Sequence, residues 1–210
     1  FVFLVGFGHF VQSQQLYWLP DGKSYAQFEG GEIIQHDLVT GRKTTLLNKD
    51  QLTPEGSSAP LSVEHFSFSP DKKKILLFTN TKRVWRIKTK GDYWIMDLTR
   101  GSLSKVGATR PASSLMFAKF SPDGSKIAYV SEYNIYVEDL STQVVKALTT
   151  NGHRRFINGT FDWVYEEEFY CRDGFRWSPD GKSIAYWQID AAETRDFMMI
   201  NTTDSIYSFT

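Results

Sequence analysis

The sequence contains very little cysteine. Cys171 is the only one among 210 residues, so no disulfide can form within the chain, and its side chain is expected to act as a small packed hydrophobic group. Histidine is also sparse, and its four residues lack the spacing that metal ligands need. We therefore expect no disulfide framework, no metal site and no cofactor.

Long stretches of one charge sign or of apolar character are missing as well. The 24 basic residues balance the 24 acidic ones, and no run of Lys and Arg beside aromatic residues could follow a phosphate backbone, so nucleic acid is not expected as a partner. The apolar residues 1–10 are too few to span a bilayer. They are expected to be either the end of a signal peptide or a buried strand.

Helical periodicity is almost absent, and a repeated turn is present instead. Each copy has an aromatic residue, a Pro-Asp-Gly type of turn and an apolar strand. The four copies are Trp18–Phe28, Phe68–Phe78, Phe120–Val130 and Trp177–Trp187. Pro fixes φ in such a turn, Asp bonds its own backbone and Gly accepts a positive φ, so each copy is predicted to form a β-hairpin.

The prolines of these turns define the repeat length. Pro20, Pro70, Pro122 and Pro179 are separated by 50, 52 and 57 residues, close to the period of a four-stranded propeller blade. The sequence therefore predicts an all-β fold, an incomplete β-propeller of about three and a half blades. Blade units are expected at residues 16–60, 61–110, 111–150 and 170–210, with an insertion at 151–170. Because closed rings need about four to eight blades, we expect the chain to be a fragment.

The second repeat is longer than its neighbours. From the proline to the following Asp-Leu pair there are 17 residues in the first and third units but 27 in the second. The ten extra residues fall around "NTKRVWRIKTKGD", which places several cations around Trp85. This insertion is either a solvated basic hairpin with longer strands or a segment that brings one cation into the mouth of the propeller. An arginine there would suit a carbonyl or carboxylate group.

A second departure from the repeat is "FDWVYEEEF" at residues 161–169, where three glutamates stand among large aromatics. In a strand, adjacent glutamates would point to opposite faces. In a helix they lie about 100° apart, so Glu167 and Glu168 could converge on one cation, such as a primary ammonium group, while Glu166 faces elsewhere. Asp162 suits an N-cap, and a short helix is predicted near 162–168. The alternative is a solvated acidic bulge.

"DWVYEEEF", followed by "FRWSPDGKSIAYWQID", resembles the dipeptidyl peptidase IV family of serine peptidases, and its bacterial members in particular. The resemblance extends from about Trp18 to Thr210. It implies the N-terminal propeller of an exopeptidase that releases X-Pro and X-Ala dipeptides. It also implies that Glu167 and Glu168 bind the free α-amino group of the substrate, and that Arg86, in "VWR", contacts a substrate carbonyl.

No G-x-S-x-G nucleophile motif occurs in the sequence, so the catalytic serine, aspartate and histidine are expected in an α/β-hydrolase domain outside it, and this chain alone is expected to be inactive. The implied partners are peptides with a free N-terminus, that hydrolase domain and a second copy in a homodimer. The implied location is outside the cytoplasm, either periplasmic or membrane-associated. The alternatives are a non-catalytic propeller for protein interaction, as a scaffold or inactive homologue, and a related oligopeptidase or acylaminoacyl peptidase.

Overall fold

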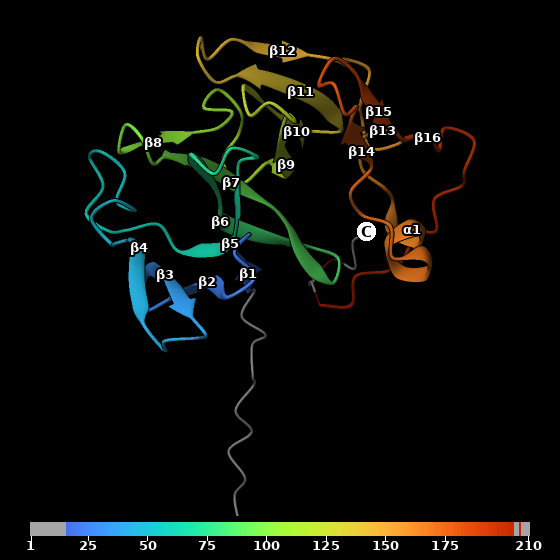
Figure 1. Ribbon diagram of the computed structural model, residues 1–210. Helices are drawn as coiled ribbons and strands as arrows, with labels where there is room; N and C mark the ends of the chain where they lie inside the picture. Colours follow the sequence, from blue (N-terminus) through green and yellow to red (C-terminus); the bar gives the residue numbers. More distant parts are fainter. Residues whose placement is uncertain (1–15, 204–205, 207–210) are drawn as a thin grey trace, which may run out of the picture.

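The computed structural model describes residues 16–203 and 206, and it is almost entirely β-structure (Figure 1). The sequence prediction for residues 1–10 therefore lies outside the described part of the chain. Within that part, no helix has the length and apolar character to cross a membrane. The all-β prediction is confirmed.

The strands form successive blades that follow one another along an arc in Figure 1. The first blade contains β1 (Tyr17–Trp18), β2 (Ser24–Glu29), β3 (Glu32–Asp37) and β4 (Lys43–Leu47). The second contains β5 (Val63–Phe68), β6 (Lys74–Val84), β7 (Ile87–Asp97) and β8 (Ser102–Lys105). The third contains β9 (Leu115–Phe120), β10 (Lys126–Ser131), β11 (Asn134–Asp139) and β12 (Val145–Ala147). Two short pairs come after it, β13 (Phe156–Asn158) with β16 (Gln188–Asp190) and β14 (Phe175–Trp177) with β15 (Ile184–Tyr186).

The Pro-Asp-Gly turns form hairpins, as predicted, and join the first two strands of each blade. The serine before the proline donates to the aspartate at 2.6 Å in three of the turns, through Ser69, Ser121 and Ser178. The residue after the aspartate has a positive φ in all four. Lys72 stands where the other turns have glycine, and its φ is 60°. Its ammonium donates to the Tyr17 hydroxyl at 2.9 Å, a contact that glycine could not make.

Aspartates in the turns between strands predict a loss of stability in acid. Hydrogen bonds from nearby hydroxyl and backbone N–H groups lower the pKa of Asp123 and of Asp139 to about 2. Folding therefore gains stability from them above the unfolded pKa near 3.8, and this gain is lost as pH falls from about 4 toward 2. We expect the urea midpoint of the chain to fall over that range. Asp123→Asn should make the fall shallower, and an unchanged midpoint would contradict the linkage.

The apolar core lies between blades. Strand β6 is buried on both faces: Ile75 and Leu77 pack toward the first blade, whereas Leu76 and Phe78 pack toward the third. This division follows from the alternation of side chains along a strand. Strand β10 repeats the arrangement, since Ile127 and Tyr129 face the second blade while Ala128 and Val130 face the β14–β15 pair.

A polar contact also joins the third blade to the β14–β15 pair. Lys119 Nζ donates to both carboxylate oxygens of Asp173, at 2.5 and 2.6 Å, and to the Phe175 carbonyl at 2.9 Å. Burial lowers the pKa of Lys119 to about 8 in spite of this pairing.

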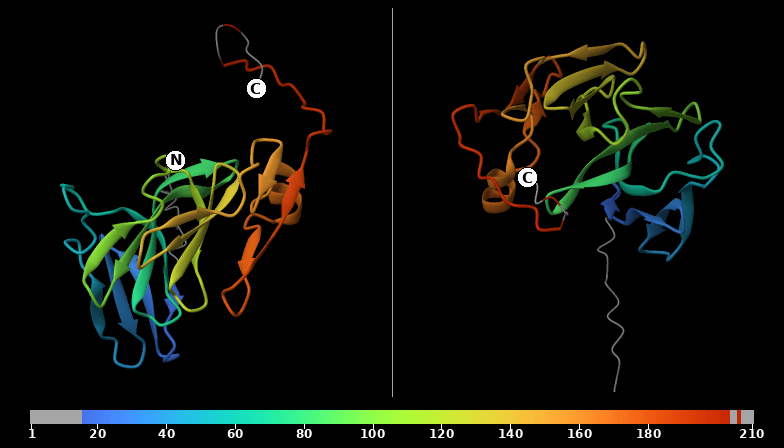
Figure 2. Two further views of the ribbon diagram at one scale, coloured as in Figure 1. Left: turned by 90° about the horizontal axis from the view of Figure 1, so that it is seen from above. Right: turned by 180° about the vertical axis from the view of Figure 1, so that it is seen from behind.

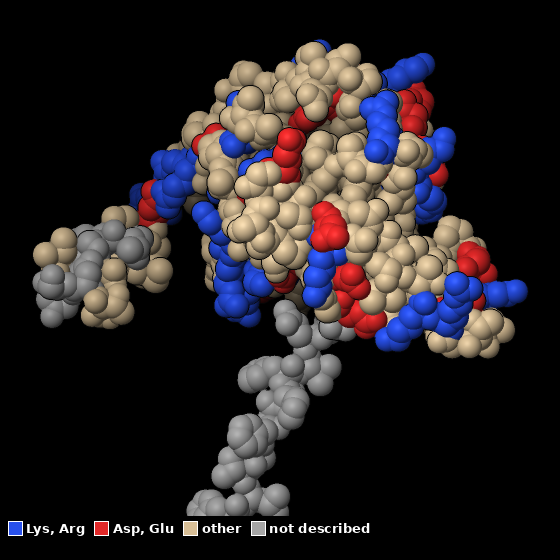
Figure 3. All heavy atoms as spheres, turned by 90° about the vertical axis from the view of Figure 1, so that its left-hand side faces the viewer, with Lys and Arg blue, Asp and Glu red and all other residues tan. Residues whose placement is uncertain are grey.

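On the face shown in Figure 3, acidic and basic side chains lie beside one another, and neither sign of charge covers a large area.

Candidate functional site

Residues 80–91 of the second blade, which include the ten extra residues, form an extended hairpin that we call the arm. Strands β6 and β7 pair in regular register from Lys74–Asp97 to Thr79–Asp92, and then continue beyond the blade to a tight turn at Trp85 and Arg86. This green hairpin extends toward the orange helix both in Figure 1 and in the rear view of Figure 2. The insertion therefore consists of longer strands and also brings a cation to a specific partner.

That partner is the short helix α1 (Trp163–Phe169), which confirms the predicted helical turn. Asp162 is its N-cap, and its side chain accepts from the Tyr165 backbone N–H at 3.5 Å. The helix ends at Tyr170, whose φ of 54° lies in the left-handed region and lets the chain turn back. Helical geometry thus directs the three glutamates to different sides of one turn.

The three glutamates have different environments. Glu167 Oε2 lies 2.6 Å from Arg86 Nε, and its side chain is only 6% exposed. Glu166, 4% exposed, lies 3.6 Å from Arg172 Nε. Glu168 is exposed and forms no ion pair with any residue in the described part of the chain. Two of the three negative charges therefore have a guanidinium partner, and one does not.

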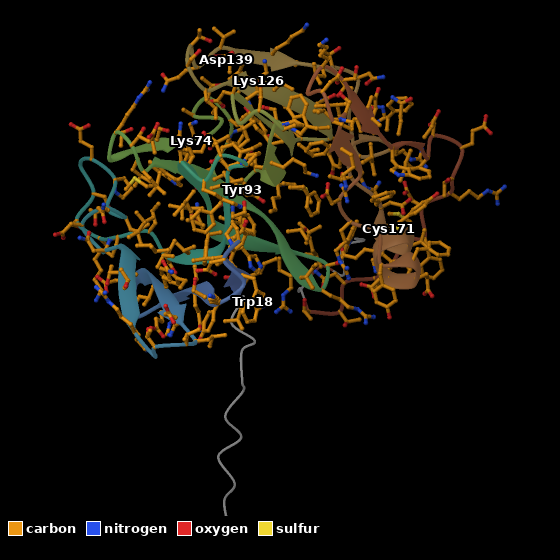
Figure 4. The ribbon with its side chains drawn as sticks, in the orientation of Figure 1. Trp18, Lys74, Tyr93, Lys126, Asp139 and Cys171 are labelled. Carbon is orange, nitrogen blue, oxygen red and sulfur yellow. The ribbon has the colours of Figure 1, made fainter. Side chains whose placement is uncertain are left out.

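A cavity of about 710 Å³ adjoins this cluster. The arm contributes Trp85, β9 contributes Phe117, and the segment around α1 contributes Phe161, Glu166 and Arg172. Cys171 also lines the cavity and is half-buried beside α1 (Figure 4), so the expectation of a packed hydrophobic group is only partly met. Among residues 16–203 and 206, no three His, Cys, Asp or Glu side chains are grouped so that they could hold a metal ion.

The structure therefore brings together two of the three residues selected from the sequence, Arg86 and Glu167, although about 80 residues separate them along the chain. Glu168 is on the same helix but is exposed to solvent. The sequence predicts that Glu166 faces elsewhere, and it does not indicate Arg172 as the partner of that side chain. The only sequence signal is a lone arginine shortly after the acidic run, which is too common a pattern to be informative.

Comparisons with known proteins agree with this architecture. The model of the family described as "Dipeptidyl peptidase IV (DPP IV) N-terminal region" matches residues 69–208. Among curated proteins, dipeptidyl aminopeptidase B of Saccharomyces cerevisiae is 36% identical over 88% of this chain and 23% of its own length. Dipeptidyl peptidase 4 of Trichophyton tonsurans is 32% identical over 83% of this chain and 22% of its own length. The chain thus spans about a quarter of these relatives.

Solved structures give the same result. The crystal structure of Porphyromonas gingivalis dipeptidyl peptidase 4 superposes with a TM-score of 0.81 at 25% identity, over 93% of this chain and 28% of that one. A putative dipeptidyl aminopeptidase IV from Bacteroides ovatus shares the fold at a TM-score of 0.59 and 18% identity, over 93% and 25% of the two chains. The family match covers well over half of the sequence, and this chain therefore belongs to the dipeptidyl peptidase IV N-terminal region family.

Proposed function

We propose that this chain is the substrate-recognition propeller of a serine exopeptidase that releases N-terminal X-Pro and X-Ala dipeptides. In this proposal Glu167 and Glu168 bind the α-amino group of the substrate, and Arg86 contacts a substrate carbonyl. The hydrolase domain that performs the chemistry belongs to the whole protein. The relatives named as dipeptidyl peptidases support the reaction class.

The observation that carries the proposal is the charge balance around α1. Arg172 pairs with Glu166, and Arg86 pairs with Glu167. The negative charge of Glu168 is the one that remains uncompensated. A substrate ammonium carries one positive charge and three donors, so it would neutralise this remainder while it reaches a second acid. The buried Oε1 of Glu167 has no hydrogen-bond partner among the described residues and offers that second acceptor.

The geometry also suits the role of Arg86. Its ion pair with Glu167 is made through Nε, at 2.6 Å, and its side chain is 77% exposed. In this proposal the terminal nitrogens of the guanidinium group donate to a neutral acceptor such as a peptide carbonyl. An ammonium held beside one end of the arginine and a carbonyl at the other would fix the first residue of a peptide at a set distance from a nucleophile. Blocked or longer N-terminal segments would then be rejected.

The test is a comparison of free and acetylated substrates with the whole protein. We expect release of the dipeptide from an Ala-Pro amide with a free amine, and inhibition by a serine-directed phosphonate. The N-acetylated amide should react roughly a hundredfold to a thousandfold more slowly, because it leaves acidic groups of the site unpaired. Equal rates on both substrates would instead favour an acylaminoacyl peptidase or oligopeptidase, and no hydrolysis of either would favour a non-catalytic propeller.

A further inference from the structure

The base of the arm differs from the equivalent point of the next blade. In the third blade, Ser131 pairs with Asn134 and a two-residue turn closes the hairpin. The equivalent pair in the second blade is Thr79 with Asp92, because both pairs lie the same distance from the Pro-Asp turn and from the Asp-Leu pair. The arm is inserted between these two residues. Its direction is therefore decided where it leaves the blade.

Pairing between β6 and β7 does not set that direction on its own. On the other side of the base, Lys90 and Gly91 of β7 pair with Met116 and Leu115 of β9, which holds the β7 strand of the arm against the third blade. The register shifts between Thr79 and Lys82, and Asn80 has a φ of 45°, so the ladder is interrupted at the base of the arm. From Asn80 to Arg86 the arm is about 20 Å long at roughly 3.3 Å per residue. A rotation of about 10° at the base would thus move its tip by about 3 Å, enough to break the ion pair of 2.6 Å between Arg86 and Glu167.

A buried carboxylate constrains the other strand of the arm, β6, through Asn80. Asp92 is 5% exposed. It accepts from the Asn80 side-chain amide at 2.7 Å and from the Ser113 backbone N–H at 2.9 Å, and it lies 3.3 Å from Lys105 Nζ. The Ser113 hydroxyl in turn donates to the Asn80 carbonyl at 2.8 Å. Burial alone would raise the pKa of Asp92, but these hydrogen bonds and the charge of Lys105 outweigh it and hold the pKa below its ordinary value.

We propose that Asn80, Asp92 and Ser113, which we call the arm lock, position Arg86 against Glu167. The inference rests on the proposed function, because it assigns to these residues the preorganisation of the amine and carbonyl contacts. The arm also contacts its own blade at Glu64, through an ion pair from Lys88 at 2.8 Å and a long hydrogen bond from the Thr81 hydroxyl at 3.4 Å. Lys88 is exposed and Glu64 is partly exposed, so the ion pair contributes little to the direction of the arm. The arm lock acts through Arg86 and touches no substrate.

The test uses Asn80→Gly in the whole protein. Glycine adopts the φ of Asn80 without strain but has no amide to donate, while Asp92 keeps its contacts with Ser113 and Lys105. We expect KM for a free-amine Ala-Pro amide to rise about tenfold, with kcat within about twofold. In an Arg86→Ala background the same substitution should change KM less than about twofold, because the positioned group is already absent. A purely structural role would give the same factor in both backgrounds.

Gln143→Gly is the matched control, since Gln143 also has a positive φ, 58°, and lies in an exposed turn of the third blade away from the arm. It should leave KM unchanged. Amide hydrogen exchange in residues 81–90 should accelerate in Asn80→Gly and not in the control. The arm lock would be overturned by an unchanged KM or unchanged hydrogen exchange in Asn80→Gly. It would also be overturned if Asn80→Gly raised KM by the same factor with and without Arg86→Ala. Failure of the unsubstituted protein to release the dipeptide from a free-amine Ala-Pro amide would overturn the proposed function, and the exchange experiment would still test the arm lock.

Discussion

In the whole protein, replacing both Glu167 and Glu168 by alanine should cost about 3–5 kcal/mol of transition-state binding for X-Pro substrates with a free amine. The physical reason is the loss of the two acids that the proposal assigns to the ammonium. Glu166 keeps its ion pair with Arg172, and Arg86 loses its carboxylate partner and places an uncompensated positive charge beside the substrate amine. Attraction is thereby replaced by repulsion, and the measurement is kcat/KM on an Ala-Pro amide.

The comparison needs a glutamate outside the cluster. Glu193 is exposed and does not line the cavity, so Glu193→Ala should change kcat/KM less than about twofold. The double variant should also lose its discrimination between free and N-acetylated substrates, because neither substrate then leaves an acid unpaired. If the double variant retains the kcat/KM of the unsubstituted protein, the assignment of these two acids is wrong.

Much of the fold was predictable because it is determined by local chemistry. The Pro-Asp-Gly turns specify hairpins through backbone conformation, and their spacing gives the length of a blade. The equivalence of Thr79 with Ser131, and of Asp92 with Asn134, can be counted from the sequence alone. The size of the arm could therefore be predicted. The helix at 163–169 was also predictable, because the N-cap Asp162 is adjacent in sequence to the residues that it caps.

The contacts of the site were less predictable because they depend on how the chain turns and on residues that are distant along it. Nothing local to Glu166 indicates that Arg172 lies against it, since this depends on the left-handed backbone of Tyr170, a residue type that seldom adopts it. Likewise, Asp92 resembles any other strand residue until Asn80 and Ser113 are placed beside it. The resemblance to a known family selected Arg86 and two glutamates, but the residues that lie against them could be found only from coordinates.

The segment that carries α1 depends on a glycine that the sequence did not single out. Between β12 and β13 the chain passes close to the Glu132–Tyr133 turn of the third blade before it reaches the helix. Gly152 lies at the crossing, where its N–H donates to the Asn134 side chain at 2.9 Å. A Cβ at this position would lie 2.2 Å from the Tyr133 carbonyl oxygen and 2.7 Å from Asn134 Oδ1. Because the first obstacle is backbone, no side-chain rotation could relieve the clash.

Gly152→Ala should therefore destabilise the chain by about 4 kcal/mol or prevent it from folding, well beyond the effect of most single substitutions. Gly41→Ala separates the two reasons why glycine is needed. Gly41 has a φ of 70° and no atom within 4 Å of the place that a Cβ would occupy, so alanine there meets only backbone strain, about 1 kcal/mol. Urea unfolding of the two variants measures the difference. Similar small losses at both positions would show that the loop moves aside, and the placement of α1 would then not depend on this close approach.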